Sequence, residues 1–305
     1  MEDDDRPDDP MREERVALLR RLVTHLGRIA PAGPGSYSAP VEAGTFDRVY
    51  GGQIIAEGLM AAAQTVPASK QFNSVHCHFL RLGNPTEPIV HHVEEIRDSR
   101  SFSVRMVRAE QAGRTITAAA YSFAEQAEGL DHQWAMPATP DPETTTPRDR
   151  ELIEIYGRDL PPNAGVPWPI DLRHVDRRPW DSEAGAGHQR IWMRADERLP
   201  DDPVLHTAVL LYASDLTMVE SVIARHPIDW EDLIAGKGRF GASLDHAFWM
   251  HAPVRADDWL LHVQESPRGG SARGFCTGRF FDRSGILVAS VAQEIFIRST
   301  GEERV

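Results

Sequence analysis

Apolar and polar residues follow two periods along this chain, one typical of helices and one typical of strands. In the first half, the spacing of apolar residues predicts an amphipathic helix over 11–29 and an alanine-rich, mostly buried helix over 51–64. Strand patterns come next, separated by turns that contain glycine or proline. These strands are predicted at 72–80, 89–96, 101–110 and 114–124. A helix followed by an antiparallel meander is therefore expected.

The same order of elements returns in the second half. A strand is predicted over 189–194 and a helix over 203–223. Ser74–Phe79 aligns with Ser243–Phe248, which marks an internal repeat. Two copies of one small α+β fold are expected, each with a central helix against a curved antiparallel sheet, which is the hotdog arrangement. The remaining strands are predicted at 242–251, 259–265, 271–282 and 286–298.

Composition divides the chain into four stretches. Residues 1–10 are acidic and carry few apolar side chains, so a disordered tail is expected there. Residues 11–128 are predicted to form the first hotdog domain with its leading helix, and residues 188–305 the second. Between them, residues 129–187 are rich in proline and have one short helical pattern, around 151–156, which is typical of a linker.

The charge balance narrows the possible partners. The 305 residues carry 33 basic and 46 acidic side chains, a formal net charge of −13, which disfavours binding to nucleic acid. No apolar run approaches the ~20 residues that span a membrane, and no export signal is visible. The two cysteines, Cys77 and Cys276, suggest neither a disulfide framework nor a zinc site. A cytoplasmic protein is predicted, in which any anionic ligand needs a local cluster of arginines.

Two polar side chains interrupt apolar faces in the second half. Asp215 lies on the apolar face of the predicted helix 203–223, and Gln293 lies on the inward face of the strand 286–298. A buried carboxylate without polar partners costs several kcal/mol, so a functional pairing of the two is expected. The alternatives are an ion pair for Asp215 and a backbone-bonded amide for Gln293. Ser243 begins a strand, and its own sequence context does not fix which way it faces.

His76 and His78 share one face of the strand 72–80, as two ligands of a metal would. No third ligand is identifiable, so no metal is predicted. His76 is a candidate acid or base instead, although a partly buried strand histidine is the ordinary alternative. The sequence G-x-S-x-G is absent, which argues against an α/β-hydrolase.

Several separate motifs resemble those of the acyl-CoA thioesterase II family, in the order in which that family carries them. The resemblance implies an α+β double hotdog fold with two tandem repeats. It also implies hydrolysis of fatty acyl-CoA to a free acid and coenzyme A, without a cofactor. The motifs are Tyr50-Gly51-Gly52-Gln53, Ser74-Val75-His76-Cys77-His78-Phe79-Leu80-Arg81, Leu211-Tyr212-Ala213-Ser214-Asp215-Leu216, Leu244-Asp245-His246 and Ser271-Ala272-Arg273-Gly274.

By this resemblance, the catalytic aspartate of the family falls on Asp215 and its glutamine on Gln293. Its third member, usually threonine, is Ser243 here, which keeps the hydroxyl and loses a methyl group. The implied mechanism has Asp215 as general base for a water held among the three side chains, with no covalent acyl-enzyme. Backbone N–H groups at the start of the buried helix, near Gly51-Gly52-Gln53, are candidates to stabilise the oxyanion.

Acyl-CoA is the implied partner, and its phosphates need arginines. One segment between strands offers Arg97 and Arg100, and the equivalent segment of the other half offers Arg268 and Arg273. Because proteins of this family commonly form oligomers, the resemblance also implies a homodimer or homotetramer. The full set of predicted substrate-binding residues is Gly52, Gln53, His76, Arg97, Arg100, Arg268 and Arg273.

Two other functions stay open at this point. A hotdog hydratase or dehydratase acts on the same thioesters through a histidine paired with an acid, and His76 or His246 would be that histidine. The second is an acyl-CoA-binding protein without catalytic activity, in which serine at position 243, in place of the family's threonine, would reflect the loss of catalysis. Release of a free thiol from acyl-CoA separates these possibilities.

Overall fold

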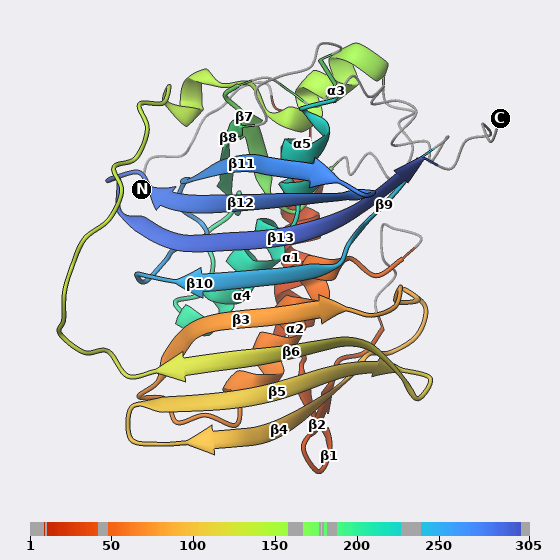
Figure 1. Ribbon diagram of the computed structural model, residues 1–305, viewed down its shortest axis with the longest axis vertical. Helices are drawn as coiled ribbons and strands as arrows, with labels where there is room; N and C mark the ends of the chain where they lie inside the picture. Colours follow the sequence, from red (N-terminus) through yellow and green to blue (C-terminus); the bar gives the residue numbers. More distant parts are fainter. Residues whose placement is uncertain are drawn as a thin grey trace.

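The computed structural model describes residues 9, 11–41, 48–157, 167–176, 178, 180, 181, 188–226 and 239–299. The first half contributes β1 (Ala30–Gly33), β2 (Ser36–Ser38), β3 (Gln71–Phe79), β4 (Val90–Asp98), β5 (Phe102–Gln111) and β6 (Arg114–Ala124). The rest contributes β7 (Asp171–His174), β8 (His188–Arg194), β9 (Arg239–Ser243), β10 (Asp245–Met250), β11 (Leu260–Gly270), β12 (Arg273–Asp282) and β13 (Leu287–Ser299). These form one antiparallel sheet in the order β1-β2-β4-β5-β6-β3-β10-β13-β12-β11-β8-β7, and β9 pairs with β13 (Figure 1).

Helices cover one face of this sheet. α2 (Gly51–Ala63) and α4 (Pro203–Ser214) pack against each other behind the sheet, one in each half, and α1 (Arg12–Gly27) contacts both (Figure 1). α4 begins where the Asp202 carboxylate accepts hydrogen bonds from the backbone N–H groups of Val204 and Leu205. Because α2 and α4 are rich in alanine and aliphatic residues, the largest apolar cluster contains residues of both halves.

The two repeats join through the strands that align in the sequence. β3 and β10 are antiparallel neighbours, with Ser74 opposite Trp249 and His78 opposite Asp245. β3 carries the first copy of the repeated segment and β10 carries most of the second, so the repeat pairs with itself near the centre of the sheet. This is the architecture of two hotdog units that share one sheet, as the sequence predicts.

Two predicted elements of the second half are each divided in two. The helix expected over 203–223 ends at Ser214, and the short helix α5 (Met218–Ile223) follows Asp215–Thr217. The strand expected over 242–251 is interrupted at Leu244. At that point, the Leu244 N–H donates to the Glu294 carbonyl of β13, and its carbonyl accepts from the Phe79 N–H of β3. The chain stays paired with β13 on both sides of Leu244, in a shifted register, and from β10 onward it also pairs with β3, which the local pattern of apolar residues does not reveal.

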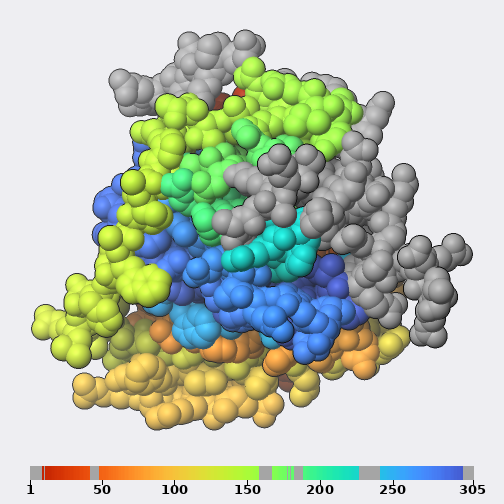
Figure 2. All heavy atoms as spheres, turned by 45° about the horizontal axis from the view of Figure 1, so that its top comes forward, coloured from red at the N-terminus to blue at the C-terminus, as the bar shows by residue number. Residues whose placement is uncertain are grey.

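The proline-rich stretch 129–187 is more than the linker that was expected. It contains the 3-10 helix η1 (Pro142–Thr144), the helix α3 (Arg148–Tyr156) and the fully buried strand β7. Just after β6, the chain runs along the outside of the sheet from the first half to the second, as the yellow-green segment in Figures 1 and 2 shows. The short hairpin β1–β2 is also not predicted by the sequence pattern.

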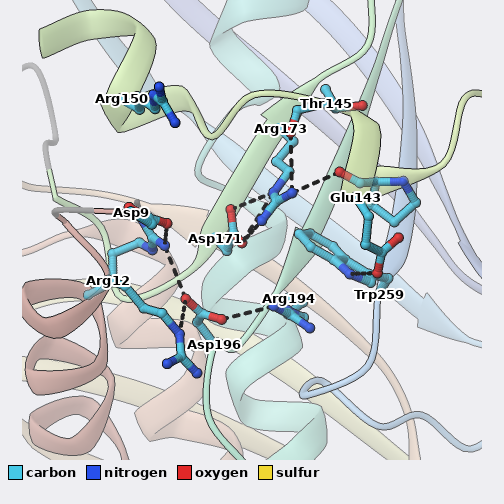
Figure 3. A network of polar contacts seen from close by, with 12 residues as sticks. Asp9, Arg12, Glu143, Thr145, Arg150, Asp171, Arg173, Arg194, Asp196 and Trp259 are labelled. Carbon is cyan, nitrogen blue, oxygen red and sulfur yellow. Dashed lines mark hydrogen bonds and ion pairs between the residues drawn. The ribbon is translucent and has the colours of Figure 1, made fainter. Parts of the chain in front are cut away.

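Buried polar contacts attach this stretch to the rest of the second half. Arg173 bonds Asp171 on its own strand and the carbonyl of Pro142, and the indole N–H of Trp259 donates to Glu143 at 3.1 Å (Figure 3). The predicted tail 1–10 lies outside the described residues except for Asp9, whose carboxylate contacts the buried Arg15. Arg15 also contacts Asp149 of the stretch 129–187 and Asp196 of the second half, so it links the segments on either side of the first domain to the second.

Both cysteines are free and buried, Cys77 in β3 and Cys276 in β12. Burial raises the pKa of the Cys276 thiol to about 12, so the thiol form persists at neutral pH. Within the described ranges, no helix has the length and apolar character needed to cross a membrane.

Candidate active site

Asp215 lies where α4 ends and the chain turns towards α5. It is 9% exposed, and it faces groups from several elements rather than solvent. Burial raises the pKa of its carboxyl above the usual value, while the charge of His246 and hydrogen bonds from its neighbours oppose that rise. Asp215 is therefore a buried acid with polar partners, as its place on an apolar face predicts.

Ser243 and Gln293 reach Asp215 from the sheet. Ser243 closes β9, and Gln293 lies on β13 close to the residue that pairs with Ser243. The Gln293 amide nitrogen donates to Asp215 Oδ1 at 2.8 Å and to the Ser243 hydroxyl at 2.6 Å. The Ser243 hydroxyl in turn donates to Asp215 Oδ1 at 3.3 Å. Three elements thus bring the three predicted catalytic side chains into direct contact.

The first half closes this site with the start of α2. The backbone N–H of Gly52 donates to the Asp215 carboxylate. A Cβ atom on Gly51 would lie 2.8 Å from Asp215 Oδ2 and 2.9 Å from the Phe79 ring, and one on Gly52 would lie 2.6 Å from the Tyr212 carbonyl oxygen. Only glycine permits so close an approach. The positive end of the α2 dipole consequently faces the acid.

Behind Gln293 lies a residue whose place the sequence did not reveal. His246 on β10 is fully buried, and its Nδ1 atom lies 2.6 Å from Gln293 Oε1. Its Nε2 atom lies 2.9 Å from the hydroxyl of Ser214, the residue just before Asp215. The only available signal was the motif Leu244-Asp245-His246, which says nothing about what the ring contacts.

Tyr50 is another neighbour that sequence patterns missed. Its hydroxyl donates to the Tyr212 carbonyl at 2.9 Å, and its ring packs edge-on against those of Tyr212 and Trp168. Burial and the nearby Asp215 charge raise the pKa of the Tyr50 hydroxyl well above the usual value. The ring therefore acts as a neutral wall at the start of α2.

A cavity of about 140 Å³ lies on the outer side of α2, beside Tyr50 and Tyr212. Gln53 lines it, and the Gln53 amide donates to the Glu57 carboxylate at 2.7 Å. The rest of the lining is largely apolar, with Trp168 among its residues. Gln53 thus faces a space next to the site without touching the three central side chains.

The structure does not bring His76 to Asp215. His76 is exposed on β3, and its ring packs edge-on against Trp249 at a centroid distance of 5.1 Å.

Among the described residues, no group of three or more His, Cys, Asp and Glu side chains is placed to hold a metal ion.

The four candidate arginines are divided between opposite edges of the sheet. Arg268 and Arg273 flank the β11–β12 hairpin, and Gly274 pairs with Ile295, which pairs with Ser243. Arg97 and Arg100 lie at the β4–β5 hairpin, whose tip is at the other end of the strands (Figure 1). Only Arg268 and Arg273 therefore share an edge with Ser243, and the assignment of these four arginines to coenzyme A phosphates stays a prediction.

Two family models match this sequence. Residues 39–124 match the acyl-CoA thioesterase N-terminal domain, and residues 167–296 match the model described as acyl-CoA thioesterase. The first match contains Gly51 and Gly52, and the second contains Asp215, Ser243 and Gln293.

Whole proteins give the same result. Acyl-coenzyme A thioesterase 8 of Mus musculus is 36% identical, with 83% of this chain and 81% of that protein covered. Acyl-CoA thioesterase 2 of Haemophilus influenzae is 30% identical, with 83% and 88% covered. The crystal structure of acyl-CoA thioesterase II TesB2 from Mycobacterium marinum superposes with a TM-score of 0.74 at 35% identity, covering 92% of this chain and 99% of that one. The chain therefore belongs to the acyl-CoA thioesterase II family, and it is a double hotdog enzyme that hydrolyses acyl-CoA thioesters.

Proposed function

We propose that Asp215 is the general base of this hydrolysis and that Ser243 and Gln293 hold the attacking water beside it. The observation that carries the proposal is the convergence of both side chains on Oδ1 of one buried carboxylate, at 3.3 and 2.8 Å. A hydroxyl can donate and accept, and an amide nitrogen donates, so together they can orient a water molecule. Asp215 then takes a proton as the water oxygen attacks the thioester carbon.

The attack converts the carbonyl oxygen into an oxyanion, which we assign to the start of α2. The first turn of a helix presents backbone N–H groups and a partial positive charge, and here it approaches to within contact of Asp215. In this proposal the backbone N–H of Gln53 is the donor, because the N–H of Gly52 is already engaged with the Asp215 carboxylate. As the intermediate collapses, the carbon–sulfur bond breaks and the coenzyme A sulfur receives the proton from Asp215. The products are a free acid and coenzyme A.

The raised pKa of Asp215 supports the role of a base. A carboxylate with a pKa above its usual value binds a proton more strongly, so it removes one from water more readily. The hydrogen bonds from Gln293, Ser243 and Gly52 favour the charged form and limit this rise. The same groups therefore position the base and keep it in the ionised state that it needs.

For the substrate, we propose that the cavity beside Tyr50 and Gln53 receives the part of the acyl-CoA next to its thioester. We also propose that Arg268 and Arg273 bind the phosphates of coenzyme A. Arg273 already pairs with Glu294 at 3.0 Å, so its guanidinium is close to the Ser243 edge. Replacing both arginines by glutamine should raise KM for acyl-CoA and leave phosphate-free thioesters unaffected. Equal KM values for the wild type and this variant would exclude the assignment.

The alternative of a hydratase or dehydratase loses its candidate bases. Both ring nitrogens of His246 are engaged within the protein, and the ring is fully buried. His76 is exposed on β3 and lies against Trp249 instead of an acid. Neither histidine therefore matches an acid–base pair at the Asp215 site.

The decisive experiment compares the wild type with Asp215→Asn by thiol release from acyl-CoAs of several chain lengths. Asparagine keeps the shape but cannot take the proton, so turnover should fall by about 10² to 10⁴. Asp257→Asn is the matched control, because Asp257 is a buried carboxylate near the opposite end of α4. That control should retain turnover even if it lowers the melting temperature. Wild-type turnover in a folded Asp215→Asn variant would exclude Asp215 as the base and favour a different site.

We further propose a cytoplasmic enzyme of fatty-acid metabolism that forms a homodimer or homotetramer. Two free, buried thiols suit a reducing compartment. Apolar side chains such as Leu130, Trp134 and Phe275 are exposed on the single chain, which favours an interface between copies. Light scattering at micromolar concentration tests the oligomer, and a monomeric mass would exclude it.

A further inference from the structure

The Gln293 amide fits the site in one orientation only. Its nitrogen donates to Asp215 and Ser243, so its oxygen must point away from them. The reverse orientation would place the amide oxygen against the carboxylate, where two acceptors would face each other. A glutamine side chain can turn by half a circle at its last bond, so a donor on the oxygen side adds to the preference of Asp215 for the productive orientation.

His246 occupies that position. Its Nδ1 atom lies 2.6 Å from Gln293 Oε1, and because a carbonyl oxygen only accepts, Nδ1 must carry the proton. On the other side of the ring, Nε2 lies 2.9 Å from the Ser214 hydroxyl, which also lies 2.8 Å from the Leu211 carbonyl. Whichever of these two acceptors takes the single Ser214 proton, Nδ1 still donates to Gln293.

From this chain of contacts we propose that His246 is a positioning residue, which fixes the Gln293 amide with its nitrogen towards the reacting water and ties it to the end of α4 through Ser214. Ser214 directly precedes Asp215, so the contacts form a closed ring of Ser214, His246, Gln293 and Asp215. His246 and Ser214 are both fully buried. His246 acts through Gln293 and does not touch the substrate. The inference rests on the proposed roles of Asp215 and Gln293.

Two substitutions of similar size separate this role from simple packing. In His246→Asn, the amide nitrogen takes nearly the place of Nδ1 and can donate to Gln293. In His246→Gln, the longer side chain fills more of the space but places its amide near Nε2, facing Ser214. We expect His246→Gln to lower kcat by about 10-fold to 100-fold, the range known for the loss of a hydrogen-bond partner that orients a metal ligand. His246→Asn should retain most of the rate, with KM unchanged in both.

A double-mutant cycle with Gln293→Ala completes the test. If His246 acts through Gln293, the effect of His246→Gln on kcat should largely vanish when Gln293 is already absent. His206→Gln is the control, because His206 is a buried histidine near the other end of α4 that accepts from the Ala256 N–H. Its effect should be the same in both backgrounds.

Two outcomes would overturn the inference. One outcome is that the kcat values of the two His246 variants follow their melting temperatures and that His246→Gln is faster than His246→Asn. The other is full additivity between His246→Gln and Gln293→Ala. If Asp215→Asn and Gln293→Ala both keep wild-type turnover, the proposed function itself fails. If those two lose activity while His246→Gln is additive, only the role of His246 is refuted.

Discussion

At the scale of residues, the chemistry depends on one carboxylate whose surroundings pull its pKa in two directions. Burial raises the pKa of Asp215, and partners that favour the charged form lower it, with a net rise. The sign of the linkage follows from this. Because the folded protein favours the protonated carboxyl, the contribution of Asp215 to stability is present at low pH and is lost as pH rises through the raised pKa. The fold therefore tolerates a destabilising charge at neutral pH for the sake of the reaction.

This shift predicts the acidic limb of the pH profile. A base is lost when it is protonated, so kcat should fall as pH is lowered through a value above the ordinary aspartate pKa of 3.8. The measurement is thiol release at saturating acyl-CoA between pH 4 and pH 8, the reagent being chosen to work across that range. Asp257→Asn should show the same limb. If kcat stayed constant as the pH was lowered towards the ordinary aspartate pKa, the result would contradict a raised pKa for Asp215.

Ser243 gives a second prediction at this scale. Its hydroxyl accepts from Gln293 at 2.6 Å and donates to Asp215 at 3.3 Å, so Ser243→Ala leaves an amide hydrogen without a partner. Turnover should fall about 10-fold, which corresponds to a hydrogen bond of about 1.4 kcal/mol. Ser243→Thr keeps the hydroxyl and restricts its rotation, so it should match or exceed the wild type. If the alanine variant were as active as the threonine variant, the hydroxyl would have no part in turnover.

The sequence revealed this site unevenly, for physical reasons. Asp215 and Gln293 could be found because each is polar on an apolar face. Ser243 could be placed only by family resemblance, since a serine at a strand end carries no signal of burial. His246 and Ser214 could not be placed, because a contact between β10 and the end of α4 depends on packing between elements far apart in the chain.

At the scale of elements, periodicity predicted where helices and strands lie but not where they break. Apolar residues continue at helical spacing past Asp215, so the pattern predicted one helix over 203–223 where the structure has α4 and α5. The break places Asp215 at a helix end, where its carboxylate can meet the start of α2. The interruption at Leu244 is likewise a place where the pairing with β13 shifts register and where β3 becomes a second neighbour of the chain. Both breaks follow from long-range pairing.

The close approach of α2 gives a prediction for Gly51. Alanine normally favours a helix more than glycine does. Here its Cβ would lie 2.8 Å from Asp215 Oδ2 and 2.9 Å from the Phe79 ring, so Gly51→Ala should displace the acid and lower kcat by up to about 10²-fold. Gly27→Ala is the control, since a Cβ there meets nothing within 4 Å. Equal kcat values for the two variants would show that the contact does not constrain the base.

At the scale of the whole molecule, the repeat makes the double hotdog predictable, while the stretch between the repeats contains more structure than its composition predicts. Prolines and weak periodicity suggested a linker, yet β7 is buried at the end of the sheet and Arg173 ties it to η1. Short strands surrounded by charged residues lack the alternation that identifies a strand. Their burial depends on ion pairs with distant residues, which no local pattern contains.

The buried Arg15 shows what these ion pairs contribute. Its guanidinium on α1 contacts Asp149 on α3 at 2.5 Å, Asp196 after β8 at 3.0 Å, and Asp9. Arg15→Met removes the cation and leaves the carboxylates buried together, so the free energy of unfolding should fall by about 3 to 5 kcal/mol in chemical denaturation. Arg20 lies on the same helix as Arg15 and forms an exposed ion pair with Glu197. Arg20→Met should therefore change the free energy of unfolding little. Because the partners of Arg15 are Asp9, Asp149 and Asp196 and none of the three central side chains, kcat of the folded Arg15→Met protein should stay near the wild-type value. Equal stability of the two methionine variants would mean that the segments beside the first domain dock without help from this cation.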